Sequence, residues 1–279
     1  MTATKLSMKR VDKPWGRHQL WPGFDDPAPD SAPVGEIWFE APGASDPDLL
    51  IKYLFTSEKL SVQVHPDDAR ARAAGFARGK DEAWVILAAA PDSTIALGTR
   101  APLSEAAFRA AALDGSIAEL LDWKPVQAGD VFYSAAGTVH AIGAGITLVE
   151  VQQNVDLTYR LYDYGRLREL HLEAAIAVAN RVPFVAHTAP GDVGEGRQIL
   201  VAGPKFTLER WSGGDRRISL PQGTGGWLVP LEGRGDVDGA TWHAGECWGV
   251  AGEVAIAADP GSDLLLAYSG ADRAAVLAR

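Results

Sequence analysis

The sequence predicts a mainly β protein, with two β-sandwich domains and a few short helices. Its 279 residues include 30 Gly and 17 Pro, a composition typical of short strands joined by many turns. From Gln198 onward, strand patterns recur roughly every eight to twelve residues, which favours an antiparallel sandwich or barrel. Residues 245–256 also echo residues 129–142, which indicates a second domain of similar fold, although turn-rich strands can resemble one another by chance. The predicted domains are residues 1–185, which would bind a metal, a linker over residues 186–197, and a smaller metal-free domain over residues 198–279.

Composition and charge narrow the classes of partner. The net charge of −10 argues against nucleic acid or an anionic membrane surface, although a local cluster of Lys and Arg can still bind a small anionic substrate. Cys247 is the one cysteine, so we expect neither an internal disulfide nor a thiolate-rich metal cluster. The N-terminus lacks the apolar region of a signal peptide, and no apolar run approaches membrane-spanning length. We expect a cytoplasmic protein that is a monomer or a weak homodimer.

The N-terminal part begins with turns and two strand patterns. Residues 13–16 form a predicted turn, and residues 25–33, rich in Pro and Asp, form a predicted exposed loop. A strand pattern follows with Glu36 at its start, where the carboxylate could equally face solvent or a pocket. Residues 49–55 are a second strand pattern, apolar except for Lys52.

The strand pattern over residues 60–64 is central to the predicted site. Apolar and polar residues alternate strictly, so Gln63 and His65 share one face of the strand. Pro66 ends the strand because it has no N–H for the ladder. Two side chains at this spacing can hold a single ion. Taken alone, however, such a pair is more often a surface Gln and a structural His.

Two helical patterns interrupt the strands. We expect a short helix within residues 67–77, capped by Asp68. Residues 102–122 predict a longer helical stretch, which Ser104 caps and Gly115 divides in two.

Three strand patterns carry further polar groups. The first begins at Glu82, at the point where an apolar run starts. Residues 129–140 predict a strand, a tight glycine turn and a return strand that carries His140. Residues 146–151 predict another strand, which contains Glu150. These patterns place polar groups on strands that can belong to one sheet system.

The segment that follows is unusual for a simple strand. Residues 153–166 are polar and aromatic and include Arg160 and Arg166. Residues 172–180 then predict a short Ala-rich helix.

Four residues on these strands form a candidate metal site. Gln63, His65, Glu82 and His140 offer two nitrogen and two oxygen donors, a set that suits Zn²⁺ or another divalent first-row metal. Each His alone is more often structural, and their combination favours a metal site. The remaining histidines lack such a context and are expected to be surface or packing residues: His18, His171, His187 and His243.

Four separated motifs, in the same order, resemble the type I mannose-6-phosphate isomerases, specifically the short bacterial form. They are residues 61–66 (SVQVHP), 79–84 (GKDEAW), 136–142 (AGTVHAI), and Glu150 followed by 158–166 (TYRLYDYGR); residues 13–16 and 35–38 also match. The resemblance covers roughly residues 10–185. Residues 129–140 are also similar to the second cupin motif, with Ala135 where cupins usually carry Pro.

The resemblance implies a zinc-dependent aldose–ketose isomerase on a jelly-roll (cupin) fold. Its reaction would interconvert mannose 6-phosphate and fructose 6-phosphate through an enediol. Gln63, His65, Glu82 and His140 fall on the metal ligands of the family, for one Zn²⁺ per chain. Arg160 falls on its catalytic arginine, and Lys80 and Glu150 fall on active-site positions.

The implied chemistry assigns a role to each group. A metal can polarise the carbonyl beside the weakly acidic C–H bond, and a guanidinium can stabilise the oxyanion that forms. A base must move a proton between C1 and C2, and Glu150 is our candidate. Lys80, Arg160 and Arg166 would supply positive charge for the enediolate or the phosphate.

Other functions remain open. A cupin dioxygenase would use similar ligands around Fe²⁺, but Lys80 and Arg160 have no evident task in O₂ chemistry. A sugar-binding regulator without catalysis would not need a complete ligand set and Arg160. Another sugar or sugar phosphate could also be the substrate of the same isomerase chemistry.

Overall fold

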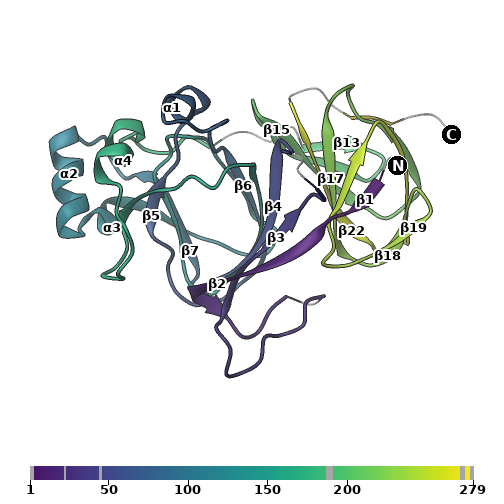
Figure 1. Ribbon diagram of the computed structural model, residues 1–279, viewed down its shortest axis with the longest axis horizontal. Coiled ribbons are helices and arrows are strands. Elements are labelled where there is room, and N and C mark those ends of the chain that lie inside the picture. The colour runs from purple at the N-terminus through teal and green to yellow at the C-terminus, as the bar shows by residue number, and fades with distance from the viewer. Residues whose placement is uncertain (1–2, 22, 44–45, 187–190, 271–273, 277–279) are drawn as a thin grey trace.

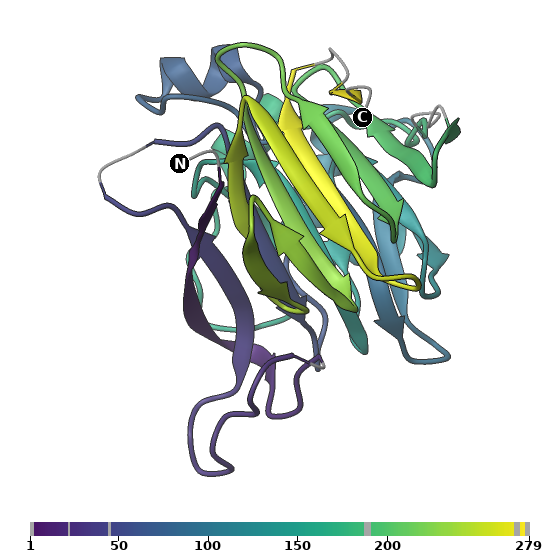
Figure 2. The same cartoon turned by 90° about the vertical axis from the view of Figure 1, so that its right-hand side faces the viewer.

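The predicted fold class is confirmed. The computed structural model describes residues 3–21, 23–43, 46–186, 191–270 and 274–276. Within these ranges the protein is mainly β, with short helices at one end of the molecule (Figure 1). The strands form sheets of seven, six, five and five strands. Figure 2, turned by 90°, shows the C-terminal strands in front of the N-terminal ones, so the two halves are stacked.

The N-terminal half is a sandwich of two sheets. In hydrogen-bonded order, the six-stranded sheet contains β2 (Ser7–Arg17), β3 (Val34–Glu40), β4 (Leu49–Phe55), β11 (Ile146–Gln153), β6 (Glu82–Ala89) and β9 (Val131–Ser134). The five-stranded sheet contains β12 (Tyr159–Tyr162), β5 (Val62–Val64), β10 (His140–Ile142), β7 (Thr94–Thr99) and β8 (Leu121–Pro125). From β4 to β12 the chain changes sheet at every connection except β7 to β8, which is the winding of a jelly roll.

The C-terminal half repeats this winding. Its seven-stranded sheet contains β1 (Ala3–Lys5), β20 (Trp248–Ala251), β17 (Gly225–Glu232), β22 (Asp263–Ser269), β15 (Phe206–Ser212), β14 (Arg197–Ala202) and β13 (Gly191–Gly194). Its five-stranded sheet contains β19 (Ala240–His243), β18 (Arg234–Val237), β21 (Glu253–Ala258), β16 (Arg216–Ser219) and β23 (Ala275–Val276). The strands β15 to β23 follow the same course as β4 to β12. The sequence echo between residues 129–142 and 245–256 therefore falls on equivalent crossings, β9 to β10 and β20 to β21.

Two strands bear on the predicted domain limits. β1 pairs with β20, with Ala3 opposite Val250, so the first described residues belong to the C-terminal sheet. β13 lies inside the predicted linker and pairs with β14. The division into residues 1–185, 186–197 and 198–279 stays a prediction.

The hydrophobic core has several layers. Between the two large sheets, aromatic and aliphatic side chains of β4, such as Tyr53 and Phe55, share one buried cluster with Phe206 and Leu208 of β15. A separate cluster containing Trp211, Trp242 and Trp248 fills the C-terminal sandwich. Because the large sheets are apolar on this shared side, the two sandwiches pack against each other rather than against solvent.

Four short helices are present in the described ranges. They are α1 (Asp68–Ala73), α2 (Glu105–Asp114), α3 (Ile117–Leu120) and α4 (Leu172–Val178). Residues of α2 and α4 share a buried cluster with Val62 and Val64 of β5, so these helices cover the outer face of the five-stranded sheet. Across the portion of the chain that the structure describes, no helix is long and apolar enough to cross a membrane.

The helix ends test the predicted caps. Ser104 caps α2 by accepting a hydrogen bond from the Ala107 N–H, and Gly115 ends this helix in the left-handed region, as predicted. The predicted cap of α1 is wrong by one residue. Asp67 accepts the Arg70 N–H at 2.8 Å, while Asp68 turns away and accepts the N–H of Gly79 at 2.8 Å.

Candidate metal centre and active site

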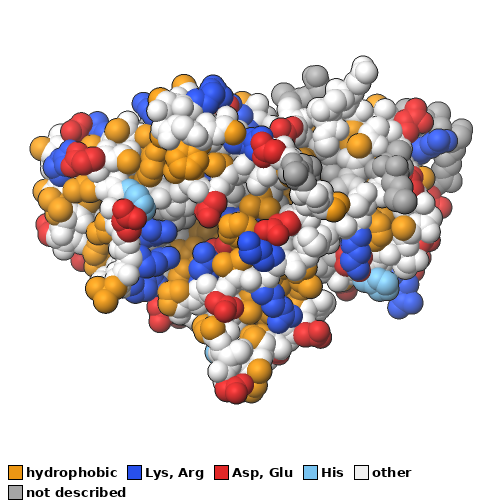
Figure 3. Space-filling view, in the orientation of Figure 1, with side chains coloured by type: hydrophobic (Ala, Val, Ile, Leu, Met, Phe, Trp, Pro, Cys, Tyr) orange, Lys and Arg blue, Asp and Glu red, His pale blue; other side chains and the backbone are white. Residues whose placement is uncertain are grey.

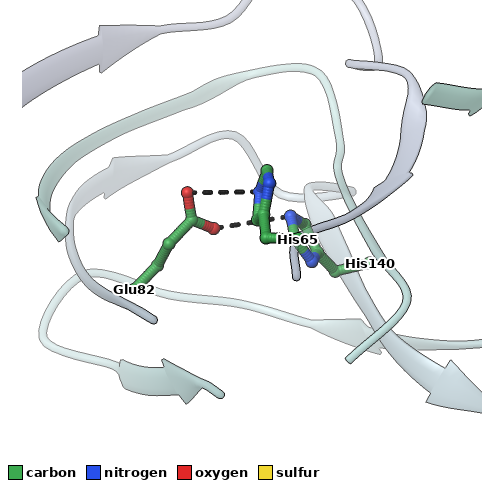
Figure 4. Close-up of side chains that lie close together, drawn as sticks. All are labelled: His65, Glu82 and His140. Atoms are coloured by element: carbon green, nitrogen blue, oxygen red, sulfur yellow. Dashed lines mark ion pairs between the residues drawn. The ribbon is translucent and has the colours of Figure 1, made fainter. Parts of the chain in front are cut away.

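Three predicted metal ligands meet inside the N-terminal sandwich. His65 follows β5, Glu82 begins β6 and His140 begins β10. All three side chains are almost completely buried. Figure 4 shows the carboxylate of Glu82 facing both imidazole rings. His140 pairs with Gln63 across the two strands, so β5 and β10 bring their polar faces to one point.

The donor atoms of these residues lie close together. His65 Nε2 is 3.4 Å from Glu82 Oε1, and His140 Nε2 is 3.4 Å from Glu82 Oε2. One ligand atom from each residue lies within 4.8 Å of the other two. This separation matches three donors around one small cation.

Backbone carbonyls fix which nitrogen of each ring faces the centre. His65 Nδ1 lies 2.8 Å from the carbonyl of Leu157, and His140 Nδ1 lies 2.9 Å from that of Thr138. A carbonyl only accepts, so each Nδ1 must donate, and each neutral ring keeps its lone pair on Nε2. Within the described residues, Glu82 Oε2 receives no hydrogen bond. The two Nε2 lone pairs and the carboxylate therefore converge on one point, which the ammonium of Lys80 and the amide nitrogen of Gln63 also approach, and a divalent cation fits that arrangement.

The charge states suit metal binding. Burial lowers the pKa of His65 to about 4, and the positive charge of Lys80 acts in the same direction. Burial also lowers the pKa of His140. Burial alone would raise the pKa of Glu82, but Lys80, His65 and His140 together outweigh burial and hold this pKa well below the usual range. Both imidazoles are thus neutral and the carboxylate is charged, as metal ligands must be.

Lys80 belongs to the same cluster. Its Nζ lies 2.6 Å from Glu82 Oε1 and 3.4 Å from His65 Nε2. Burial would lower the pKa of Lys80, but Glu82 and Glu150 outweigh burial and raise it. The buried ammonium group is therefore charged and points at the candidate metal centre.

Gln63 lies beside the three residues but presents its amide nitrogen to them. Gln63 Nε2 is 3.2 Å from His140 Nε2, and Ser61 Oγ donates to Gln63 Oε1 at 3.3 Å. A half-turn of the amide would exchange its nitrogen and oxygen. The assignment of Gln63 as a ligand stays a prediction.

A cavity of about 240 Å³ opens next to the metal centre. Charged side chains contribute much of its lining: Lys13, Lys52, Lys80, Arg160, Arg168, Glu36, Glu150 and Asp156. Figure 3 shows Lys, Arg, Asp and Glu side chains gathered around a hollow in the N-terminal half. A small, highly polar and charged ligand fits such a lining better than an apolar one.

Glu150 lies on β11 between two partners from neighbouring strands. Lys52 of β4 and Trp84 of β6 stand directly opposite it in the ladders. Lys52 Nζ is 3.3 Å from Glu150 Oε1, and Trp84 Nε1 donates to Oε2 at 3.1 Å. Burial, followed by the charge of Glu82, raises the pKa of Glu150. A carboxylate with a raised pKa, buried beside a cavity, is suited to proton transfer.

Arg160 lies on β12 in register with Gln63, so the structure places it beside the same centre. Its Nη1 donates to the carbonyl of Glu169 at 3.0 Å, while its Nε is buried without a hydrogen-bond partner in the described residues. The backbone N–H of Arg160 donates to His171 Nδ1 at 3.2 Å. Burial and the like charge of Arg168 lower the pKa of Arg160.

Sequence reasoning missed three cations of the cavity, Lys13, Lys52 and Arg168. Lys52 interrupts the apolar strand pattern over residues 49–55, and a buried Lys in such a run was a usable signal. Arg168 lies outside the recognised motifs and had no such signal. Arg166, to which the sequence assigned a role at the substrate, is instead bound by Asp163 and does not line the cavity.

The structure also locates histidines that were predicted to lie outside the site. His18 contacts the carbonyl of Ser31, and His243 lies beside Glu246 at the surface. His187 lies outside the described residues.

Comparison with known proteins supports the resemblance seen in the motifs. No family model matches the chain. A mannose-6-phosphate isomerase of Streptococcus mutans is 40% identical over an alignment of 172 residues that covers 58% of this chain and 54% of that protein. The chain thus spans about half the length of this curated relative.

Solved structures show the same fold over nearly the whole chain. The crystal structure of the mannose 6-phosphate isomerase from Bacillus subtilis has a TM-score of 0.82 at 25% identity, covering 96% of this chain and 99% of that chain. A zinc-bound mannose 6-phosphate isomerase has a TM-score of 0.71 at 14% identity, covering 97% of this chain and all of that chain (100%). At that identity, the second likeness concerns the fold alone.

Proposed function

We propose that this protein, a relative of mannose-6-phosphate isomerases in sequence and fold, is a metal-dependent aldose–ketose isomerase that interconverts mannose 6-phosphate and fructose 6-phosphate. The observation that carries the proposal is the buried group of His65, Glu82 and His140 beside a cavity lined by cations and by Glu150. A metal ligand set alone would fit many reactions. Its combination with a buried candidate base and several cations fits proton transfer next to a carbonyl.

The proposed metal is Zn²⁺, one ion per chain, with another divalent first-row metal as the alternative. Two imidazole nitrogens and a carboxylate are common zinc ligands, and Gln63 is the proposed fourth. The zinc-bound relative of the same fold supports this choice. Bound here, the ion would act as a Lewis acid on the sugar carbonyl.

Each remaining residue has a separate proposed role. Glu150 moves the proton between C1 and C2, since its raised pKa matches a group that must both accept and return a proton. Lys52 and Trp84 orient its two oxygens. Arg160 and Lys80 supply positive charge to the enediolate, and the unpartnered Nε of Arg160 is free to do so.

A cupin dioxygenase is the competing class, because Fe²⁺ accepts the same donor atoms. The cavity argues against it, since five of its lining side chains are Lys or Arg, which O₂ activation does not require. We further propose that the protein works in the cytoplasm on a small sugar phosphate, as a monomer or weak homodimer. A single buried cysteine suits a reducing compartment.

A coupled isomerase assay tests the proposal. Protein supplied with Zn²⁺ is given mannose 6-phosphate, and fructose 6-phosphate is measured; free mannose and other hexose phosphates are compared in parallel. The expected result is turnover of mannose 6-phosphate with the highest kcat/KM of the set. Turnover of another sugar instead would reassign the substrate. No isomerisation of any sugar, with O₂ consumption by the Fe²⁺-loaded protein, would overturn the proposal in favour of the dioxygenase.

A further inference from the structure

We propose that Arg168 binds the phosphate group of the substrate and that Asp163 positions it for this task. This inference rests on the proposed function, because it names the residue that would bind the phosphate group of a sugar phosphate. It adds a subsite to the metal centre and the base described above.

Asp163 is a buried carboxylate that holds two arginines. It accepts hydrogen bonds from Arg168 Nε at 2.6 Å and Nη2 at 2.7 Å, and from Arg166 Nε at 3.0 Å and Nη2 at 2.7 Å. Only 1% of its side-chain surface is exposed. One negative charge therefore faces two guanidinium groups, so the trio carries an excess of positive charge.

That excess lies on the side of Arg168. Arg166 has further partners, because it also lies 3.3 Å from Glu58 and donates to the Lys59 carbonyl at 2.7 Å. Arg168 lines the cavity, whereas Arg166 does not. With Nε and one N–H of Nη2 committed to Asp163, Arg168 keeps Nη1 and the second N–H of Nη2 for a ligand.

The three lysines that line the cavity each face a carboxylate. Lys80 lies 2.6 Å from Glu82, Lys52 lies 3.3 Å from Glu150, and Lys13 lies 3.5 Å from Glu36. These pairs neutralise much of the positive charge of the three lysines.

The two arginines of the cavity differ from these lysines. Arg160 donates to a carbonyl rather than to a carboxylate. Among the residues that the structure describes, Arg168 pairs with one carboxylate, that of Asp163, and shares it with Arg166. Arg168 and Arg160 are also close enough for their like charges to interact. Although Asp156 and Glu169 partly offset the positive field of the two arginines, a dianion is attracted to them.

The cavity offers separate groups for the carbonyl and for the phosphate of a hexose phosphate. Arg160 lies in register with Gln63, next to the metal centre where the carbonyl would react. Arg168 lies on the loop after β12 and makes none of the contacts of the metal-binding residues. In mannose 6-phosphate the carbonyl and the phosphate are at opposite ends of the carbon chain. Arg168 is therefore placed for the phosphate while Arg160 is placed for the reacting carbons.

Arg166 provides a matched control. Arg168→Met and Arg166→Met each remove one guanidinium from the same carboxylate, but only the first removes a group that lines the cavity. We expect Arg168→Met to raise KM for mannose 6-phosphate about 10- to 100-fold, as for the loss of charge-assisted hydrogen bonds, with a smaller change in kcat. The ratio of kcat/KM for mannose 6-phosphate to that for free mannose should fall by a similar factor. Arg166→Met should change neither by more than about threefold.

A binding measurement separates this inference from the isomerase proposal. Inorganic phosphate is titrated by calorimetry into zinc-loaded wild type and both variants, after circular dichroism has shown that each is folded. Binding that Arg168→Met weakens at least tenfold and Arg166→Met does not would support the subsite, even if no isomerisation were found. Phosphate affinity equal in all three proteins would overturn it, because the anion would then bind the metal alone. Equal KM values for the two variants would also overturn it.

Asp163→Asn tests the positioning role. The amide keeps the shape of the side chain but cannot accept four hydrogen bonds as a carboxylate does. We expect a rise in KM in the same direction as for Arg168→Met, with kcat little changed. An unchanged KM in a folded Asp163→Asn protein would show that Arg168 needs no such positioning.

Discussion

At the scale of single residues, two carbonyl groups determine how the site is built. The carbonyls of Leu157 and Thr138 each accept a hydrogen bond from the Nδ1–H group of one histidine, so both Nε2 atoms face Glu82. The sequence motifs predicted that His65, Glu82 and His140 would converge. They could not predict the tautomer of His65, because it depends on the carbonyl of Leu157, which is 92 residues away in sequence. The carbonyl that sets the tautomer of His140 is local, two residues earlier in the chain.

Arg160→Ala tests the role of the arginine beside the metal centre. A donor directed at an oxyanion acts mainly in the transition state, where one such group contributes about 3–4 kcal/mol. We therefore expect kcat to fall by roughly two to three orders of magnitude, with a much smaller change in KM. Steady-state kinetics with mannose 6-phosphate measures both. A rise in KM with unchanged kcat would instead assign Arg160 to the binding of the ground state.

Glu150→Gln tests the proposed base. The amide keeps the shape of Glu150 and its contact with Trp84, but it cannot take a proton. We expect the variant to bind zinc normally and to lose the exchange of the substrate C2 proton with solvent, as followed by NMR in D₂O. Loss of zinc from this variant would place Glu150 in the support of the metal centre rather than in proton transfer.

At the scale of elements, the segment from Gly79 to Glu82 carries two site residues and has little freedom. A Cβ added at Gly79 would lie 2.5 Å from the Asp67 carbonyl carbon and 2.6 Å from both Asp68 N and the Pro66 oxygen. All three neighbours are backbone atoms, so the segment itself would have to move. Only glycine allows this close approach of two chain segments.

Gly79→Ala should therefore weaken zinc binding by displacing Lys80 and Glu82. We expect at least a tenfold loss of zinc affinity, the size seen when groups that orient metal ligands are disturbed. Competition with a chelator of known affinity measures this. Gly225→Ala, in the C-terminal sandwich, is the control. Apart from its chain neighbours, the nearest atom to its added Cβ belongs to the Trp227 side chain and is 3.4 Å away, which is an ordinary contact. Equal zinc affinity of the two variants would show that the segment tolerates the movement.

The strands around the site show which features of the fold could be predicted from the sequence. Strict alternation over residues 60–64 predicted that Gln63 and His65 share one face of a strand. The structure limits this strand to Val62–Val64, so His65 directly follows its end. Alternation did not show whether this polar face meets solvent, and in the structure His65 is buried. The sequence predicted a strand, a tight turn and a return strand carrying His140, an arrangement that suggests two neighbouring strands of one sheet. β9 and β10 belong to different sheets, and local patterns contain no information on which strands pair.

At the scale of the whole molecule, the C-terminal sandwich contacts the loops that support the site. Lys205, which precedes β15, lies 2.6 Å from Asp68, and Asp68 accepts hydrogen bonds from the Gly79 N–H and from Gln153. The ring of Tyr133 packs against Phe206 of the C-terminal sandwich, and its hydroxyl donates to Asp81. Repetition in the sequence predicted a second sandwich. These contacts between the two halves were not predictable, because their partners are far apart in sequence.

The free energy of unfolding should depend on pH through Asp68, which connects the two sandwiches. Partial burial acts to raise the pKa of Asp68, but hydrogen bonds from Lys205, Gly79 and Gln153 outweigh burial and lower it to about 2. Because the unfolded pKa is higher, about 3.9, the unfolded chain binds more protons between the two values. The stability contributed by Asp68 is thus fully present above about pH 4 and is lost as the pH falls towards 2.

Urea unfolding at several pH values measures this contribution. The difference in free energy of unfolding between wild type and Asp68→Asn should shrink steadily from pH 5 to pH 2. Lys205→Met should remove part of the same pH dependence. A difference that stays constant over this range would mean that Asp68 is not stabilised as a charged group in the folded state.

A zinc titration of the isomerase reaction tests the central claim most directly. Protein stripped of metal is reconstituted with increasing Zn²⁺, and bound zinc and the rate of fructose 6-phosphate formation are measured on the same samples. The account predicts no activity without metal, a rate that rises in proportion to bound zinc, and saturation at one ion per chain. Full activity in samples shown to contain no metal would contradict it.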